Sequence, residues 1–115
     1  MIFVIDDDEV MAGCIARACG GEVQIYGNAI EAMETIAEGV VPDLIFLDVL
    51  LDGPDGFTFL HEMVSYTDTA KVPVVVVSSL DFAGKDLSVY GVVGVLDKAE
   101  MLPKEVRAYA AKYAQ

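Results

Sequence analysis

The regular alternation of short apolar runs with helix-like segments is the feature that most constrains this fold. A strand that is apolar throughout is buried on both faces, and strands that alternate with helices pair in parallel. We therefore predict a doubly wound, three-layer α/β/α domain whose five-stranded parallel sheet is covered on both faces. The predicted strands are Ile2–Ile5, Val23–Tyr26, Leu44–Leu47, Val72–Val77 and Val92–Leu96.

Five helices are predicted between and after these strands. Asn28 is a suitable N-cap, Gly39 a suitable stop, and Pro103 is tolerated in a first helical turn. The chain has 115 residues, so we expect one domain that spans residues 1–115. The predicted helices are Glu9–Cys19, Asn28–Glu38, Phe57–Tyr66, a weak one at Phe82–Tyr90, and Pro103–Tyr113.

Composition narrows the classes of partner. The formal net charge of −12 argues against nucleic acid or an anionic membrane as a direct partner, because phosphates are bound through clustered Lys and Arg. The longest apolar run, Val72–Val77, is far shorter than the roughly 20 residues of a membrane span, and no signal peptide is recognisable. Cys14 and Cys19 are spaced so that they point in different directions on one helix. We therefore expect a reducing, cytoplasmic location.

Reactive side chains follow four of the five predicted strands. Asp6 and Asp7 follow the first, Asp48 the third, Ser78 the fourth and Lys98 the fifth. Because ligands of open parallel sheets bind outside the carboxyl ends of the strands, we expect these groups to converge at one edge.

This set of groups predicts chemistry on a phosphoryl group. Three carboxylates and one ammonium leave a charge of −2, which one divalent cation neutralises, and carboxylate oxygens are preferred Mg²⁺ ligands. Crowded carboxylates should also raise one another's pKa values. A carboxylate can act as the nucleophile, while metal, lysine and hydroxyl bind the phosphoryl oxygens. Asp48 is the expected nucleophile, because it stands alone after a central strand beside a Gly/Pro-rich loop.

The motifs that carry these residues resemble the receiver domains of two-component response regulators over nearly the whole chain. The acidic pair Asp6 and Asp7 follows the first strand, and Asp48 lies in "LIFLDVLLDGPDG". Ser78 lies in "PVVVVSS" and Lys98 in "GVLDKAE". The resemblance implies a flavodoxin-like, CheY-like fold.

The resemblance also implies residue roles and partners. Asp48 would be phosphorylated, and Asp6, Asp7, Asp48 and the backbone carbonyl of Leu50 would bind Mg²⁺. Ser78 and Lys98 would bind the phosphoryl group. A sensor histidine kinase or a histidine phosphotransfer protein would donate that group, and a downstream protein or effector domain would read the changed surface. The domain would catalyse only its own phosphorylation and slow dephosphorylation.

Several positions depart from the family pattern. Val95 replaces the aromatic residue of the switch, and Ala99 replaces the proline that usually follows the lysine. Val93 and Gly94 replace an acidic pair found in receivers that dimerise through this region, so a monomer is expected.

Two alternative functions remain open. Val95 and Ala99 are compatible with a degenerate receiver that binds a partner without being phosphorylated. A Mg²⁺-dependent phosphatase with an aspartyl-phosphate intermediate is disfavoured, because such enzymes usually carry a second acid at the position of Leu50. Asp8 and Glu9 are best read as residues of a helix start, and His61 as a surface or half-buried residue.

Overall fold

The computed structural model describes residues 1–48, 56–65, 69–78 and 91–114. Its elements are β1 (Ile2–Ile5), α1 (Glu9–Cys19), β2 (Val23–Tyr26), α2 (Ala29–Ala37), β3 (Leu44–Leu47), α3 (Gly56–Ser65), β4 (Val74–Ser78), β5 (Val92–Asp97) and α4 (Pro103–Tyr113). Four of the five predicted helices are thus present. The predicted helix Phe82–Tyr90 lies outside the described residues.

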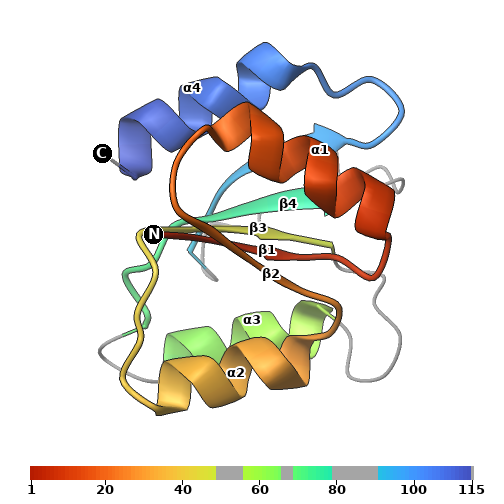
Figure 1. Cartoon of the computed structure of the whole chain (residues 1–115). Coiled ribbons are helices and arrows are strands. Elements are labelled where there is room, and N and C mark those ends of the chain that lie inside the picture. The colour runs from red at the N-terminus through yellow and green to blue at the C-terminus, as the bar shows by residue number, and fades with distance from the viewer. Residues whose placement is uncertain (49–55, 66–68, 79–90, 115) are drawn as a thin grey trace.

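The strands form one parallel sheet in the order β2-β1-β3-β4-β5. Helices α1 and α4 cover one face, while α2 and α3 cover the other (Figure 1). The predicted three-layer, doubly wound architecture is confirmed.

The burial of the individual strands explains why this sequence folds into this arrangement. Every residue of β1, β3 and β4 is buried, as expected of central strands flanked by helices on both faces. The edge strands β2 and β5 are only partly buried, because each pairs on one side alone. The core has two halves: Phe3, Ile45 and Phe59 belong to the α2/α3 side, and Phe46 and Val106 to the α1/α4 side.

Local signals account for the ends of the helices. Asn28 caps α2 by accepting a hydrogen bond from the Glu31 N–H at 2.9 Å. Gly20 ends α1 in the left-handed conformation, with φ of 72°. Strand β4 begins at Val74, two residues later than predicted, since Pro73 has no N–H to donate to a sheet ladder.

Gly94 shows how closely α4 packs on strand β5. A Cβ added at Gly94 of β5 would lie 1.9 Å from the Tyr109 hydroxyl oxygen, so only glycine leaves room for this ring of α4.

Cys14 and Cys19 are free thiols, and burial raises the pKa of Cys19 to about 11. None of the described helices is long and apolar enough to cross a membrane.

Candidate functional site

Backbone hydrogen bonds fix the residues that follow the strands. The N–H of Asp6 donates to the Tyr26 carbonyl at 3.0 Å, and the N–H of Asp48 donates to the Ile5 carbonyl at 2.9 Å. The sheet ladder therefore continues one residue past β1 and β3, and it places Asp6 and Asp48 side by side at the carboxyl edge. The N–H of Lys98 likewise donates to the Ser78 carbonyl at 3.0 Å, which anchors the residue after β5.

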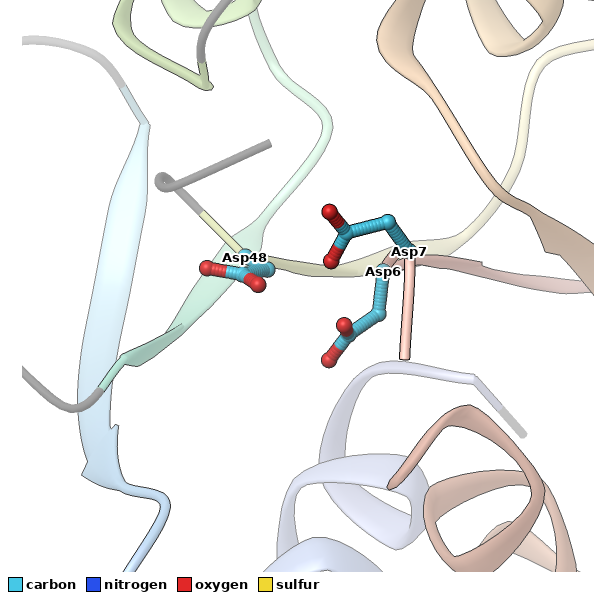
Figure 2. Close-up of side chains that lie close together, drawn as sticks. All are labelled: Asp6, Asp7 and Asp48. Atoms are coloured by element: carbon cyan, nitrogen blue, oxygen red, sulfur yellow. The ribbon is translucent and has the colours of Figure 1, made fainter. Parts of the chain in front are cut away.

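Three carboxylates gather at this edge. Asp6, Asp7 and Asp48 each offer one oxygen, and these oxygens all lie within 4.8 Å of one another (Figure 2). Asp6 is 3% exposed and Asp48 is 4% exposed, whereas Asp7 faces solvent. Like charges at such distances repel strongly where water is excluded, so the cluster needs positive charge.

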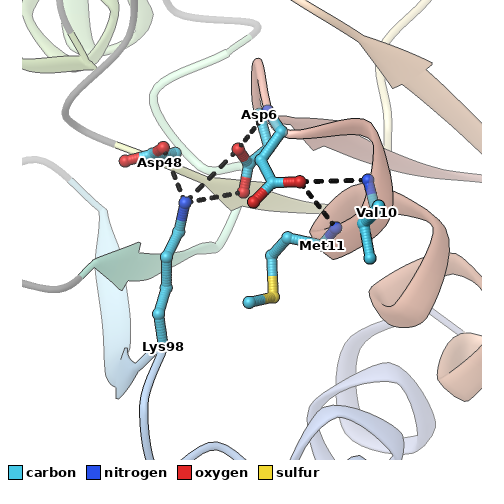
Figure 3. A network of polar contacts seen from close by, with 6 residues as sticks. Asp6, Val10, Met11, Asp48 and Lys98 are labelled. Carbon is cyan, nitrogen blue, oxygen red and sulfur yellow. Dashed lines mark hydrogen bonds and ion pairs between the residues drawn. The ribbon is translucent and has the colours of Figure 1, made fainter.

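Lys98 supplies part of that positive charge. Its Nζ lies 2.9 Å from Asp48 Oδ2 and 3.1 Å from Asp6 Oδ2 (Figure 3). Burial alone would lower the pKa of Lys98, but the hydrogen bonds and charges of Asp48 and Asp6 outweigh it and raise the pKa. Together, this ammonium and the three carboxylates of the cluster carry a net charge of −2.

Asp6 is the most constrained of the three acids. Its Oδ1 accepts a hydrogen bond from the Asp8 N–H at 2.9 Å. Its Oδ2 is buried and makes no hydrogen bond with the part of the chain that the structure describes, although it forms the ion pair with Lys98. The pKa of Asp6 is raised, chiefly by loss of water; the Asp8 N–H and Lys98 oppose the rise, and the charge of Asp48 adds only a minor part. For Asp6, the mutual repulsion predicted from the sequence is thus a smaller cause than burial.

The donor set fits a small, hard cation. Mg²⁺ prefers carboxylate oxygens, retains several waters, and takes few ligands from the protein. A buried oxygen of Asp6 without a hydrogen bond and a solvent-facing carboxylate on Asp7 match both requirements. The carbonyl of Leu50, the predicted fourth protein ligand, lies outside the described residues.

Asp8, the third consecutive aspartate, has a different task. Its Oδ1 accepts hydrogen bonds from the N–H groups of Val10 at 3.0 Å and Met11 at 3.2 Å (Figure 3). These bonds satisfy two of the unpaired donors at the start of α1. Asp8 is therefore the N-cap of this helix, which agrees with the helix-start position predicted for it.

The remaining predicted positions lie on β4, on β5 and directly after it. Ser78 is fully buried as the last residue of β4 and pairs in register with Asp97. Val95 of β5 is 43% exposed, so this position presents a small apolar side chain to solvent. Ala99 is exposed, and the peptide bond that joins it to Lys98 is trans.

Sequence reasoning missed the residue that shapes the turn after β5. Asp97 Oδ1 accepts a hydrogen bond from the Ala99 N–H at 2.8 Å, and the Asp97 carbonyl accepts from Glu100 and Met101. These hydrogen bonds hold the backbone on both sides of Lys98, whose ammonium then lies beside Asp6 and Asp48. An aspartate whose side chain reaches the N–H two residues on is an Asx-turn, a signal present in "LDKAE".

Comparison with known proteins identifies the family. The family model of the response regulator receiver domain matches residues 2–109. The chain belongs to this family. A protein-glutamate methylesterase/protein-glutamine glutaminase of Anaeromyxobacter dehalogenans is 36% identical over 92 residues, covering 76% of this chain and 25% of that protein. Response regulator PleD of Caulobacter vibrioides is 31% identical over 85 residues, covering 72% of this chain and 19% of PleD.

Solved receiver structures share the fold. The phosphorylated cyanobacterial phytochrome response regulator RcpA has a TM-score of 0.80 and 25% identity, and the match covers 97% of this chain and 91% of RcpA. The chain spans about a quarter or less of the length of these two curated relatives. Its membership places it in two-component signalling, as the sequence resemblance implied.

Proposed function

We propose that residues 1–115 form one receiver domain that accepts a phosphoryl group on Asp48 from a histidine kinase or a histidine phosphotransfer protein. The observation that carries this proposal is the pairing of a buried Asp48 carboxylate with Lys98 Nζ at 2.9 Å, inside a three-carboxylate cluster. RcpA, which shares the fold, has been solved in a phosphorylated form.

The proposed reaction moves one phosphoryl group between two side chains. A carboxylate oxygen of Asp48 attacks the phosphorus of a phosphohistidine, a P–O bond forms, and the P–N bond breaks. The electron pair of that bond stays on the ring nitrogen, and the imidazole, which carries a proton on its other nitrogen, leaves as a neutral ring. Lys98 and the Ser78 hydroxyl bind the transferred oxygens, so charge is neutralised where it develops.

Asp6, Asp7 and Asp48, with the Leu50 carbonyl, would hold Mg²⁺. The bound cation supplies charge neutralisation for the phosphoryl oxygens and for the crowded acids. Phosphorylation adds negative charge beside Lys98 and draws this ammonium away from its pairing with Asp6 and Asp48. That shift is the local event that would alter a protein-binding surface on the domain.

The domain would act as a switch whose only chemistry is the gain and slow loss of its own phosphoryl group. We propose a protein as the downstream reader, since a chain with a net charge of −12 is a poor ligand for nucleic acid. A cytoplasmic location and a monomeric state stay predictions of the sequence.

Phosphoryl transfer from acetyl phosphate tests the proposal. Wild type with Mg²⁺ should gain the mass of a single phosphate, whereas Asp48→Asn and a metal-free sample should gain none. A stable beryllofluoride complex on wild type excludes rapid hydrolysis as the reason for a missing adduct. If wild type takes neither phosphate nor beryllofluoride, the domain is a degenerate receiver that binds its partner unphosphorylated.

A further inference from the structure

Charge is divided unequally between the two helical layers. From residue 18 to residue 70 the sequence contains ten acidic residues and neither lysine nor arginine. Helices α2 and α3, which form one layer, both lie within this stretch (Figure 1). The opposite layer carries Arg17 on α1 and Lys104, Arg107 and Lys112 on α4.

The acidic layer also contains an apolar hollow. A cavity of about 500 Å³ opens between α2 and α3, and its lining includes the described residues Met33, Ile36, Ala37, Val41 and Met63. Val41 is 44% exposed, so apolar surface is open to solvent here. Methionine side chains adapt to different partners, which makes this lining suited to receiving an apolar side chain. We call this hollow the α2–α3 groove.

One acidic side chain lines the groove, and two more lie close to it along the chain. Glu62 of α3 belongs to the lining, and the exposed residues Glu34 and Glu38 directly follow the lining residues Met33 and Ala37. None of the described lysines or arginines forms an ion pair with these three glutamates. An apolar lining with acidic residues in and beside it favours a ligand that combines apolar anchors with positive charge.

The groove lies away from the phosphoacceptor site. Gly39 and Val41 precede β3, and Thr69 precedes β4, so these lining residues sit at the amino edge of the sheet. Asp48 follows β3, at the carboxyl edge. A ligand of the groove would therefore bind without touching Asp48 or its neighbours.

We propose that the α2–α3 groove docks a cationic amphipathic helix of a partner protein. Leucine-like side chains on one face of that helix would enter the hollow, and lysine or arginine would pair with Glu34, Glu38 and Glu62. An anionic lipid surface is disfavoured by repulsion from the same acids. Binding of this kind gives a rapid, salt-sensitive association, because opposite charges steer the encounter.

The test uses a fluorescein-labelled model peptide of about 18 residues, five helical turns, with leucine on one face and lysine on the other. Its affinity is measured by fluorescence anisotropy, and its contact surface by amide chemical-shift changes in the labelled domain. A peptide of the same composition in scrambled order reports general attraction to an acidic protein. The largest shifts should fall on α2, on α3 and at Val41, and the scrambled peptide should bind much more weakly.

Matched variants separate the groove from the overall charge. Ala37→Arg places a cation in the groove and should weaken binding about tenfold, whereas Ala108→Arg, the same change at an exposed position of α4, should alter it by less than about twofold. Glu34→Gln with Glu38→Gln should weaken binding more than Glu22→Gln with Glu100→Gln, which removes the same charge elsewhere.

Equal losses within each matched pair would overturn the proposal, and so would shifts centred on Asp6 and Asp48. Unchanged uptake of phosphate from acetyl phosphate by Ala37→Arg would show that this variant remains folded and that the two sites are separate. Failure of wild type to accept phosphate would leave the groove measurements valid, since they require no phosphorylation.

Discussion

At the scale of single residues, Lys98 holds the acidic cluster together. Its ammonium lies within 3.1 Å of oxygens from two buried aspartates that would otherwise repel each other. An attraction to buried carboxylates is worth more than a surface ion pair, although the Lys98 side chain, at 19% exposed, retains some contact with water. The same geometry makes Lys98 and a divalent cation alternative sources of positive charge for these acids.

Lys98→Ala should therefore destabilise the metal-free domain and do so less when Mg²⁺ is present. We expect a loss of about 2 kcal/mol in the free energy of unfolding without metal, because two buried carboxylates lose their charged partner. Saturating Mg²⁺ should narrow the gap to wild type, because the cluster without the Lys98 ammonium is more negative, binds the cation more tightly and so gains more stability from it. Urea unfolding with and without Mg²⁺ measures both values.

Lys104→Ala, at an exposed position of α4, is the control and should change stability by less than about 0.5 kcal/mol. An equal loss for Lys98→Ala in both conditions would mean that Lys98 and the metal do not share the same carboxylates.

At this scale the sequence predicted which site residues lie close together, but not how deeply each side chain is buried. Order along the chain and the direction of parallel strands were enough to bring Asp6, Asp48 and Lys98 to one edge. The dominant cause of the raised Asp6 pKa is burial, which depends on packing that no local pattern reveals. The turn at Asp97 depends on a hydrogen bond between its side chain and the Ala99 N–H, and apolar periodicity does not reveal such a contact.

At the scale of elements, the three consecutive aspartates between β1 and α1 have different roles. Asp6 and Asp7 face the cluster, whereas Asp8 turns back to cap α1. The extended backbone of Asp8, with φ of −88° and ψ of 103°, permits this reversal. Strand β1 ends at Ile5, the next two residues are candidate metal ligands, and the third is the N-cap of α1. Three residues thus provide metal ligands and also begin the next helix.

Asp8→Ala and Asp7→Ala should consequently affect different properties: the first should reduce stability, and the second should reduce Mg²⁺ affinity. Asp8→Ala should lower the unfolding free energy by about 1 kcal/mol and leave Mg²⁺ affinity within about twofold of wild type. Asp7→Ala should weaken Mg²⁺ binding by about tenfold or more and leave metal-free stability unchanged or slightly higher, because it removes a repelling charge. Calorimetric Mg²⁺ titration and metal-free urea unfolding give the two quantities. A loss of Mg²⁺ affinity in Asp8→Ala that equals that in Asp7→Ala would contradict this division of roles.

Element boundaries were predictable where a residue dictates the backbone, as Asn28 and Pro103 do. They were less accurate where a strand meets a turn. The apolar run that starts at Val72 suggested an earlier start to β4, but pairing begins only after Pro73. Strands β2 and β5 are partly exposed because they lie at the edges of the sheet. Apolar periodicity along the chain does not reveal the order of the strands, so it could not predict which strands lie at the edges.

At the scale of the whole molecule, the net charge of −12 opposes compactness. Residues 18–70 contain ten of the acidic residues and neither lysine nor arginine, so most of the excess negative charge lies in this stretch of the chain. Screening by salt should relieve that repulsion, and the phosphoacceptor site adds a second, cation-specific response at the carboxyl edge of the sheet. Ionic strength and Mg²⁺ binding should therefore stabilise the domain by separable routes.

Raising NaCl from about 0.01 M to about 0.15 M shortens the Debye length from about 30 Å to about 8 Å, and it should raise the melting temperature of the metal-free domain. A gain of about 1 kcal/mol corresponds to a rise of about 4 °C or more for a domain of this size. MgCl₂ at matched ionic strength should raise it further in wild type and by a smaller amount in Asp7→Ala, because screening acts on all charges whereas coordination needs the cluster. Thermal unfolding of both proteins in the two salts measures this difference. If NaCl and MgCl₂ at equal ionic strength stabilise wild type equally, the three carboxylates do not bind the metal, and charge screening accounts for the whole effect.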